Sequence, residues 1–187
     1  MESNFDAGQT EQVLSPWVTL VTRRVQFPES PQVQEFHSLK LADYAAVLAV
    51  TTDGRIPLVR QYRPAQQRFT LELPSGLLDP AEEPALAAAR ELWEETGWRS
   101  AAPLEPLGCL LPDSGRLENH IWGFWAEQVS PDTANSWQAE PGLEILCVSP
   151  RELQALILDG RFDHALHVAV IGLALTRGLF SFGPAAN

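Results

Sequence analysis

The sequence predicts a mixed α+β sandwich built as one compact domain. Its 187 residues are enough for a single hydrophobic core of ordinary size. Segments rich in β-branched and aromatic residues flank one Ala-rich helical segment, and two further helical segments follow near the end. With 45% hydrophobic and 20% charged residues, the chain has the composition of a globular protein and not of a disordered one. Strands around a central helix, with helices at the end, favour helices packed on a mixed sheet.

The N-terminal quarter is expected to be a tail followed by a small pair of strands. We predict a disordered tail over residues 1–14. Residues 17–27 and 33–41 carry β-branched and aromatic side chains on either side of a turn rich in Pro and Ser, which predicts a β-hairpin within residues 15–42. A strand pair of this size is too small to be stable alone, so it would serve the main domain, residues 43–180, or an interface.

Strands make up most of the predicted main domain. Residues 44–51 form a continuous apolar run, typical of a strand buried on both faces. Asp53-Gly54 is a hairpin signal that directs the chain into the next strand. The strands predicted after this turn cover residues 56–62, 69–73, 104–111, 121–129 and 143–148.

The first helix is predicted between Pro84 and Gly97. Pro suits the first helical position and Gly the position just past the end, and the segment between them, ALAAARELWEET, is rich in strong helix formers. The residues at helical spacing that we expect to face the core are Leu86, Ala89, Trp93 and Thr96.

Two more helices are predicted near the C-terminus. The first begins after Ser149, with Pro150 at its first position and Glu152 completing a capping box. The second is expected over residues 163–177. His164 and His167 lie three residues apart on it, and we interpret them as packed or solvated side chains in preference to a metal site.

Charge and hydropathy exclude several classes of function. The formal net charge of −11 disfavours binding to a phosphate backbone, so no nucleic-acid partner is expected. No apolar run reaches the roughly 18–20 residues that span a bilayer, and residues 1–12 lack the basic-then-apolar order of a signal peptide, so no membrane partner is expected. Cys109 and Cys147 are expected to be buried free thiols, which fits a cytoplasmic location.

The first helix also carries a cluster of charged residues, which are Arg90, Glu91, Glu94 and Glu95. At about 100° per residue, Glu95 lies about 40° around the helix axis from Glu91. Glu94 lies about 60° from Glu91 on the opposite side, so the three carboxylates share one face of the helix. Like charges at this spacing destabilise an isolated helix by a few tenths of a kcal/mol. Arg90 can pair with Glu94, which leaves two carboxylates for a divalent cation such as Mg²⁺. The alternative is a solvated acidic face.

The residues around this helix favour the metal interpretation. The turn Pro74-Ser75-Gly76 can bring backbone carbonyls close to the same cation. Glu82 adds a carboxylate just before the helix. The arginines that precede the turn, and that offer cationic groups to an anionic substrate, are Arg55, Arg60, Arg63 and Arg68.

These residues together resemble a known motif. The spacing from Gly76 to Glu82 and on to RELWEETGW matches Gx5Ex7REUxEExGU at every fixed position, where U is a bulky apolar residue, and so resembles the Nudix box of the Nudix hydrolases. The segments VRQYRPAQQRFTLELPSG and ILCVSPRELQALILDGRFDHA, with Pro112, resemble the ADP-ribose or ADP-sugar pyrophosphatase branch. The resemblance implies a Nudix-type α/β/α sandwich with a mixed central sheet and an N-terminal β-hairpin subdomain.

The resemblance also implies roles at a metal site. Glu91 and Glu95 would bind Mg²⁺, or Mn²⁺ in its place, together with the backbone carbonyl of Ser75. Glu94 would be a further ligand or the partner that Arg90 holds in place. Such chemistry needs metals, because they neutralise the diphosphate oxygens and activate the attacking water.

Substrate-binding and proton-transfer roles follow from the same resemblance. Arg63 would contact phosphate, and Glu72 would lie near the substrate or serve a structural role. The general base would come from a loop after the box, with Glu140 the first candidate. Glu144 is the second candidate and an alternative metal ligand. Glu118 is a third option and a possible contact to the terminal sugar, and any of the three is alternatively a surface carboxylate.

The sequence, through this resemblance, therefore predicts metal-dependent hydrolysis of the diphosphate linkage of ADP-ribose or a related ADP-sugar, which releases AMP and a sugar phosphate.

Trp17 is a candidate for stacking on a purine, with core or interface packing as the alternative. The expected partners are a small-molecule nucleotide sugar and a second copy of the chain in a homodimer. The alternatives are another nucleotide substrate (a UDP- or GDP-sugar, a dinucleotide or a modified nucleoside triphosphate) and a sensor that binds nucleotide sugar without cleaving it. LPDSGRLENHIWGFWAE departs from the branch's usual Ser-Pro-Gly run, which leaves the second moiety of the substrate open.

Overall fold

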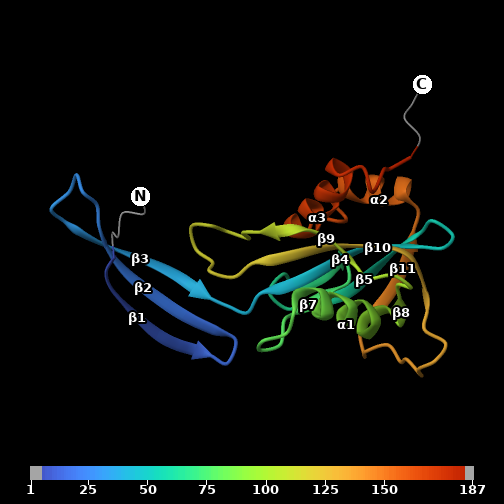
Figure 1. Ribbon diagram of the computed structural model, residues 1–187, viewed down its shortest axis with the longest axis horizontal. Helices are drawn as coiled ribbons and strands as arrows, with labels where there is room; N and C mark the ends of the chain where they lie inside the picture. The colour runs from blue at the N-terminus through green and yellow to red at the C-terminus, as the bar shows by residue number, and fades with distance from the viewer. Residues whose placement is uncertain (1–5, 184–187) are drawn as a thin grey trace. The chain divides into compact units, whose positions relative to one another are not determined.

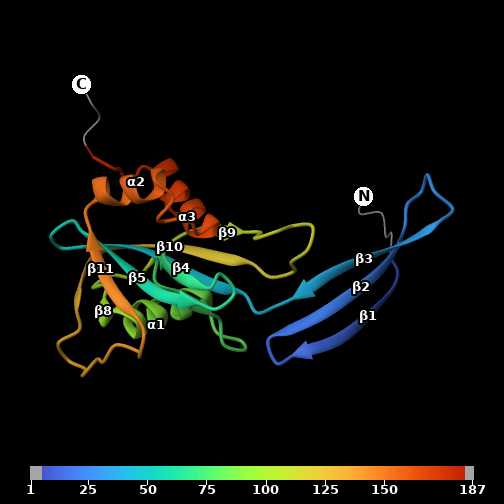
Figure 2. The same cartoon turned by 180° about the vertical axis from the view of Figure 1, so that it is seen from behind.

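The computed structural model describes residues 6–183, which form the two compact units drawn in Figures 1 and 2. One unit comprises residues 6–43 and 111–120, and the other comprises residues 44–110 and 121–183. Across these described residues, no helix has both the length and the apolar character that a membrane span requires.

The smaller unit is an antiparallel sheet with the order β1-β2-β3. Its strands are β1 (Asp6–Ser15), β2 (Val18–Gln26) and β3 (Val33–Lys40). The prediction of a disordered tail over residues 1–14 is wrong for residues 6–14, which belong to strand β1. Residues 1–5 lie outside the described residues. The side chains of β1 are nearly all exposed, so its backbone ladder with β2 and not burial holds it in place. For this reason no hydrophobic alternation marks β1 in the sequence.

The segment 111–120 joins this sheet through backbone pairing with β3. Leu39 and Leu117 form a parallel bridge. The Leu39 N–H donates to the Arg116 carbonyl at 2.7 Å, and the Glu118 N–H donates to the Leu39 carbonyl at 3.0 Å. A loop that is distant in sequence is thereby fixed to the end of β3.

The larger unit is built on a mixed sheet with the order β7-β4-β10-β8 and with β9 paired to β10. Its strands are β4 (Tyr44–Thr51), β7 (Ser75–Leu77), β8 (Trp98–Arg99), β9 (Glu105–Leu110) and β10 (Ile121–Pro131). Strands β4 and β10 run parallel at the centre, and the other three pair antiparallel with them. Strands β7 and β8 were not predicted, because strands this short carry no periodic signal.

A second, antiparallel sheet of the larger unit has the order β11-β5-β6. Its strands are β5 (Ile56–Arg63), β6 (Arg68–Glu72) and β11 (Glu144–Val148). Strand β5 lies in the middle and pairs with both β6 and β11. The sheet therefore joins two strands that precede the Nudix-like helix, β5 and β6, to one that follows it, β11.

Helices cover the central sheet on both sides, as Figures 1 and 2 show. Helix α1 (Pro84–Thr96) packs on one face, and α2 (Pro150–Leu158) and α3 (Ala165–Thr176) pack on the other. Each face has its own apolar cluster, one beneath α1 and a larger one beneath α2 and α3. The predicted α+β class and its α/β/α layering are therefore confirmed.

The core-facing side of α1 differs from the stripe predicted for it. The buried apolar residues of α1 are Ala87, Ala88 and Leu92. Leu86, from the predicted stripe, is 64% exposed, whereas Thr96 is buried as expected. The two alanines allow the helix backbone to approach Ala45 and Val47 of β4 closely. This rotation of the helix also buries Glu95, and this burial shapes the site described below.

The predicted helix ends are confirmed by their hydrogen bonds. At α2, the Glu152 N–H donates to the Ser149 hydroxyl oxygen at 3.2 Å, and the Ser149 N–H donates to the Glu152 carboxylate at 2.6 Å. Helix α1 ends at Gly97, whose φ of 71° suits glycine and whose N–H donates to the Trp93 carbonyl at 2.7 Å.

The two cysteines are less buried than expected. Cys109 is exposed on β9, and Cys147 is half-buried on β11. Both strands lie at sheet edges with a single neighbouring strand, so their side chains are covered less than those of a central strand.

Candidate active site

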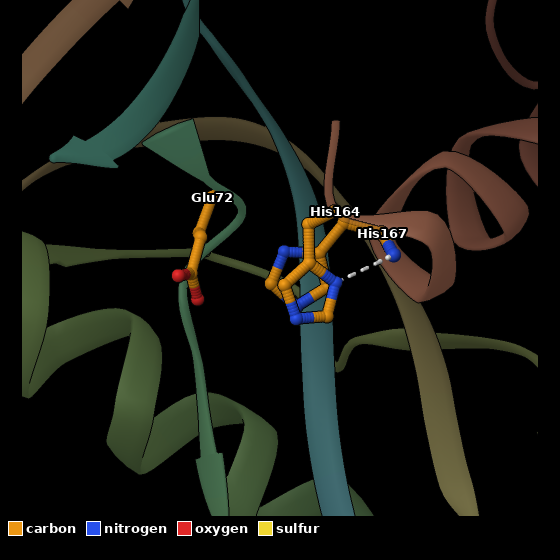
Figure 3. A group of neighbouring side chains, drawn as sticks. All are labelled: Glu72, His164 and His167. Atoms are coloured by element: carbon orange, nitrogen blue, oxygen red, sulfur yellow. Dashed lines mark hydrogen bonds between the residues drawn. The ribbon is translucent and has the colours of Figure 1, made fainter. Parts of the chain in front are cut away.

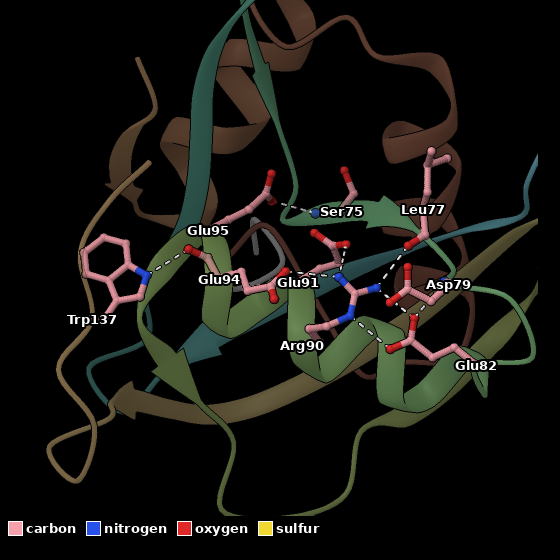
Figure 4. Close-up of polar contacts among 9 residues, drawn as sticks. All are labelled: Ser75, Leu77, Asp79, Glu82, Arg90, Glu91, Glu94, Glu95 and Trp137. Atoms are coloured by element: carbon pink, nitrogen blue, oxygen red, sulfur yellow. Dashed lines mark hydrogen bonds and ion pairs between the residues drawn. The ribbon is translucent and has the colours of Figure 1, made fainter. Parts of the chain in front are cut away.

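The site is assembled where the short strand β7 lies beside helix α1 (Figure 4). The Pro74 carbonyl accepts a hydrogen bond from the Val47 N–H at 2.9 Å, which ties the turn before β7 to the central strand. Gly76 follows in β7. A Cβ at this position would lie 2.2 Å from the carboxyl carbon of Glu91, a distance that no packed side chain tolerates. Glycine leaves this space to the Glu91 carboxylate, which would have to shift if the residue carried a Cβ.

Arg90 connects the helix to the preceding loop and to β7. Its guanidinium donates to both Glu82 carboxylate oxygens, at 2.9 and 2.8 Å, and to the Leu77 carbonyl at 3.0 Å. It also donates to Glu91 at 2.6 Å and to Glu94 at 3.0 Å. Arg90 thus holds Glu94 as predicted, but it also contacts Glu91. The hydrogen bonds from Arg90 and from the Asp79 N–H hold the pKa of Glu82 down at about 2.

Glu91 and Glu95 form the buried carboxylate pair of the site, although 13% of the Glu91 side chain remains exposed. Glu95 is 8% exposed, and its hydrogen-bond donor is the neutral Ser75 N–H at 2.8 Å. Burial, with repulsion from Glu91 and Glu72, raises the pKa of Glu95 to about 8. Burial also raises the pKa of Glu91, although the hydrogen bond from Arg90 opposes that shift. Desolvated carboxylates that repel each other fit a divalent cation, which would compensate both charges.

Glu72 and Arg63, both predicted to bind substrate, are paired with each other. The Arg63 guanidinium donates to the two Glu72 oxygens at 2.8 and 2.6 Å, and the Thr70 hydroxyl donates to the same carboxylate at 2.6 Å. Glu72 is 1% exposed, and burial alone would raise its pKa, yet these hydrogen bonds lower it to about 2. Arg63 remains 42% exposed, so part of its guanidinium is open to a ligand.

Two histidines at the start of α3 lie close to Glu72 (Figure 3). The rings of His164 and His167 stack with centroids 3.8 Å apart and an angle of 18°. His167 is fully buried, and its Nδ1 accepts a hydrogen bond from the Leu73 N–H at 3.1 Å. His164 caps α3, because its Nδ1 accepts from the His167 N–H at 3.4 Å. Only their spacing of three residues on one helix marks them in the sequence, and we did not predict them as site residues.

The loop that carries Glu140 is anchored to the end of α1 by Trp137 (Figure 4). The Trp137 indole N–H donates to the Glu94 carbonyl at 2.8 Å. Its ring also lies over Gly97, where a Cβ would come within 2.6 Å of the indole. Glu140 is exposed on this loop, and its carbonyl accepts from the Leu143 N–H. Trp137 had no signal in the sequence, because its partners are a backbone carbonyl and a glycine.

Glu144, the second candidate for the general base, has a different environment. It begins β11 opposite Arg60 of β5, and its carboxylate accepts a hydrogen bond from Arg60 at 2.8 Å. Both side chains are exposed. The described contacts of Glu144 thus belong to the second sheet, and its predicted role as base or metal ligand stays a prediction.

Glu118 and Trp17 belong to the smaller unit. The Glu118 carboxylate accepts hydrogen bonds from Arg23 and from the Ser38 hydroxyl, and these bonds lower its pKa. Trp17 is 70% exposed in the turn between β1 and β2. The predicted roles of both residues toward substrate stay predictions.

Comparison with known proteins agrees with this architecture. A 22% identical solved structure, described as a crystal structure of ADP compounds hydrolase, matches with a TM-score of 0.77 over 93% of this chain and 94% of its own, which shows a shared fold. The ADP-ribose pyrophosphatase of Bacillus subtilis (strain 168) is 40% identical over 85 residues, which are 46% of this chain and 45% of that protein. The ADP-ribose pyrophosphatase of Mycobacterium tuberculosis (strain ATCC 25618 / H37Rv) is 41% identical over 96 residues, 51% of this chain and 40% of that protein.

These curated relatives are thus matched over less than half of their own length. The family match is broader, because the NUDIX domain model covers residues 40–168 of this chain. That range contains β7, helix α1 and both carboxylates of the buried pair, so the chain belongs to the NUDIX domain family.

Proposed function

We propose that this protein is a pyrophosphatase that hydrolyses the diphosphate linkage of ADP-ribose or a related ADP-sugar and releases AMP and a sugar phosphate. The observation that carries the proposal is the buried pair Glu91 and Glu95 beside the Ser75-Gly76 backbone. The names of the two pyrophosphatases similar to this chain support the choice of an ADP-sugar.

The proposed metal is Mg²⁺, with Mn²⁺ as a substitute. Glu91 and Glu95 would hold it, with the Ser75 carbonyl and the exposed carboxylate of Glu94 as further ligands, and Glu144 as an alternative. When bound, such a cation neutralises diphosphate oxygens and lowers the pKa of an attacking water. The fit rests on two desolvated carboxylates that repel each other: Glu95 accepts from the neutral Ser75 N–H, and Glu91 shares the single positive charge of Arg90 with Glu82 and Glu94.

The chain's own residues would divide the remaining tasks. The exposed part of the Arg63 guanidinium binds phosphate oxygens, and Glu72 fixes the orientation of that guanidinium through two hydrogen bonds. Arg90 holds the carboxylates of α1 in register with the loop before it. Glu140 accepts the proton of the attacking water, and Trp137 anchors its loop.

We also propose that the protein is a cytoplasmic homodimer. The support is the smaller unit, whose sheet exposes several large apolar side chains, namely Val13, Leu14, Trp17, Phe27, Val33 and Phe36. Exposed apolar residues in such number are typical of interaction surfaces. Light scattering that gives the mass of one 20.7 kDa chain at micromolar concentration would contradict the dimer.

A product assay with Mg²⁺ tests the proposed reaction. ADP-ribose, ADP-glucose, UDP-glucose and GDP-mannose are compared for release of the nucleoside monophosphate. Glu95→Gln removes a ligand, whereas Glu83→Gln changes an exposed carboxylate at the start of the same helix and serves as the matched control. AMP should appear fastest from ADP-ribose or ADP-glucose, and Glu95→Gln should reduce its release by about 10³-fold or more. Faster turnover of UDP- or GDP-sugars would keep the catalytic residues and reject the ADP-sugar assignment.

A further inference from the structure

A pocket of about 310 Å³ extends from the β7 backbone beside the carboxylate pair to the two histidines. Ser75 and Gly76 line one part of it, and Glu72, His164 and His167 line another. A volume near 300 Å³ is at the lower end of small-molecule sites. A ligand whose diphosphate lies at Ser75 and Gly76 would therefore place a neighbouring group against the histidines.

The hydrogen bonds of His167 determine which of its nitrogens carries the proton. A neutral imidazole has one N–H and one lone pair. The Leu73 N–H donates to Nδ1, so the lone pair is at Nδ1 and the proton is at Nε2. Burial lowers the pKa of His167 to about 3, which keeps the ring neutral. Among residues 6–183, Nε2 has no hydrogen-bond partner, so it is a buried donor that lacks an acceptor.

His164 has the same arrangement. Its Nδ1 accepts from the His167 N–H, so in the neutral ring the proton is again at Nε2. One potential ligand atom from each of His164, His167 and Glu72 lies within 4.8 Å of the others, a grouping that resembles a metal site. A metal needs a nitrogen lone pair, however, and both lone pairs already accept backbone N–H groups. The grouping therefore consists of two N–H donors and one ionised carboxylate acceptor.

This combination selects the chemistry of the ligand. A phosphate offers acceptors but no donor, so it could accept from the two imidazole N–H groups and would have nothing to donate to the Glu72 carboxylate. A hydroxyl group both accepts and donates, so it can accept from an imidazole N–H and donate to the carboxylate at the same time. Sugars carry several such groups on adjacent carbons, which suits two donors and one acceptor placed side by side.

We infer that Glu72, His164 and His167 form a binding site for sugar hydroxyl groups, next to the proposed diphosphate site. This inference rests on the proposed function, because the sugar is one of the two attached to the scissile diphosphate. The chemistry is the same for the ribose of the nucleoside and for the sugar on the other phosphate, and the choice of substrates in the test separates the two.

The test uses a pair of substitutions that preserve different parts of His167. In His167→Asn the amide oxygen takes the place of Nδ1 and can still accept the Leu73 N–H, but the donor at Nε2 is lost. In His167→Gln an amide N–H reaches the Nε2 position, so the donor is retained. The half-buried His164→Phe is the second variant: it keeps an aromatic ring in the stack and removes the donor, and because it also removes the Nδ1 cap of α3, circular dichroism first confirms that the variant is folded.

Steady-state kinetics are measured with three substrates. ADP-ribose has both sugars, the methyl ester of ADP lacks the second sugar, and 2′,3′-dideoxy-ADP-ribose lacks both hydroxyls of the nucleoside sugar. We expect His167→Asn and His164→Phe to raise KM for ADP-ribose about tenfold with little change in kcat, and His167→Gln to restore most of that loss. The effect should vanish on whichever analogue lacks the hydroxyl that the site binds.

Three results would overturn the inference. The first is an equal effect of the variants on all three substrates, which would indicate a structural role or an internal water. The second is no effect of His164→Phe and His167→Asn on folded protein. The third is stoichiometric Zn²⁺ binding that His164→Phe abolishes while Glu95→Gln retains it, which would make the cluster a metal site.

If the wild-type protein cleaves no diphosphate, the proposed function fails, and calorimetry with ribose 5-phosphate then tests the inference by itself. The inference fails if the wild-type protein and His167→Asn bind ribose 5-phosphate equally.

Discussion

Two buried glutamates of the larger unit, Glu72 and Glu95, have opposite protonation behaviour. Both are at most 8% exposed, so desolvation disfavours the charged form of each. Glu72 receives two hydrogen bonds from a guanidinium and one from a hydroxyl, and its pKa falls to about 2. Glu95 receives one backbone N–H, and its pKa rises to about 8. Burial thus does not decide the charge of a carboxylate by itself, and the residue without a cationic partner is where an external cation fits.

Among substitutions that leave both carboxylates of the pair in the chain, the largest expected effect comes from filling the space at Gly76. In Gly76→Ala the new Cβ would meet the Glu91 carboxylate, so that carboxylate must leave its position in the site. Because displacement by about 1 Å costs about 10²-fold in rate, we expect turnover to fall by at least that factor. The control is Gly172→Ala in α3, where a Cβ meets nothing within 4 Å. Equal activity of the two variants would mean that the position of Glu91 is unimportant.

Removal of the Arg63 guanidinium beside Glu72 should have the next largest effect, on the free energy of unfolding. Arg63→Gln leaves a buried carboxylate without its partner, and we expect a loss of about 2 kcal/mol in the free energy of unfolding. Arg60→Gln breaks the exposed pair with Glu144 and should cost about 1 kcal/mol or less. Urea denaturation measures both. A second substitution, Glu72→Gln, should recover part of the loss in Arg63→Gln, and a lack of recovery would contradict a charge-based cause.

The two glutamates should give stability opposite dependences on pH. Because the folded pKa of Glu72 lies below its unfolded value of 4.5, its contribution is present above about pH 4.5 and is lost as the pH falls toward 2. The folded pKa of Glu95 lies above 4.5, so in metal-free protein its contribution is lost as the pH rises from about 4.5 through 8.

Denaturation midpoints in EDTA between pH 3 and pH 9 test this pair of slopes. Glu95→Gln should flatten the alkaline decline, and Glu72→Gln should flatten part of the acid decline. Addition of Mg²⁺ at pH 8 should stabilise the wild-type protein more than Glu95→Gln, because cation binding compensates the ionised carboxylate. An alkaline decline that Glu95→Gln leaves unchanged would assign it to another group.

The smallest effect concerns the contact between the Glu140 loop and α1. Trp137→Phe removes the hydrogen bond to the Glu94 carbonyl and keeps an aromatic ring over Gly97, which should cost about 1 kcal/mol. Trp93→Phe is the matched control, since the Trp93 indole N–H has no hydrogen-bond partner among residues 6–183. Hydrogen exchange of the loop amides should accelerate in Trp137→Phe alone. Equal acceleration in both would indicate general loosening of the helix.

Much of the proposed catalytic helix could be predicted, because the residues that define its ends and its charged face are close together in the sequence. Pro84 and Gly97 mark its ends, and the charges of Arg90, Glu91 and Glu95 lie within two turns, where 3.6-residue periodicity alone decides which side chains share a face. The same reasoning placed the core stripe of α1 wrongly. Several rotations of an Ala-rich helix bury apolar groups almost equally, and contact with β4 selected the one observed.

Strand β1 illustrates a different reason for failure. Its side chains remain exposed after folding, so the sequence carries no pattern of burial to detect, and pairing with β2 is what makes it a strand. The candidate base residues show a related difficulty, because Glu140 and Glu144 are close in sequence but lie in different structural contexts, one on an exposed loop and one at the start of β11.

The sequence by itself determined the carboxylate motif, the glycine that accommodates it and the caps of α1 and α2, because each depends on residues within a few turns of one another. Tertiary structure alone decided the rest of the pocket. The Leu73 N–H meets His167 across 94 residues, and the Trp137 indole meets Glu94 across 43. Contacts at such separations depend on how sheets and helices pack, and no local pattern encodes them; they set the tautomer of His167 and anchor the Glu140 loop.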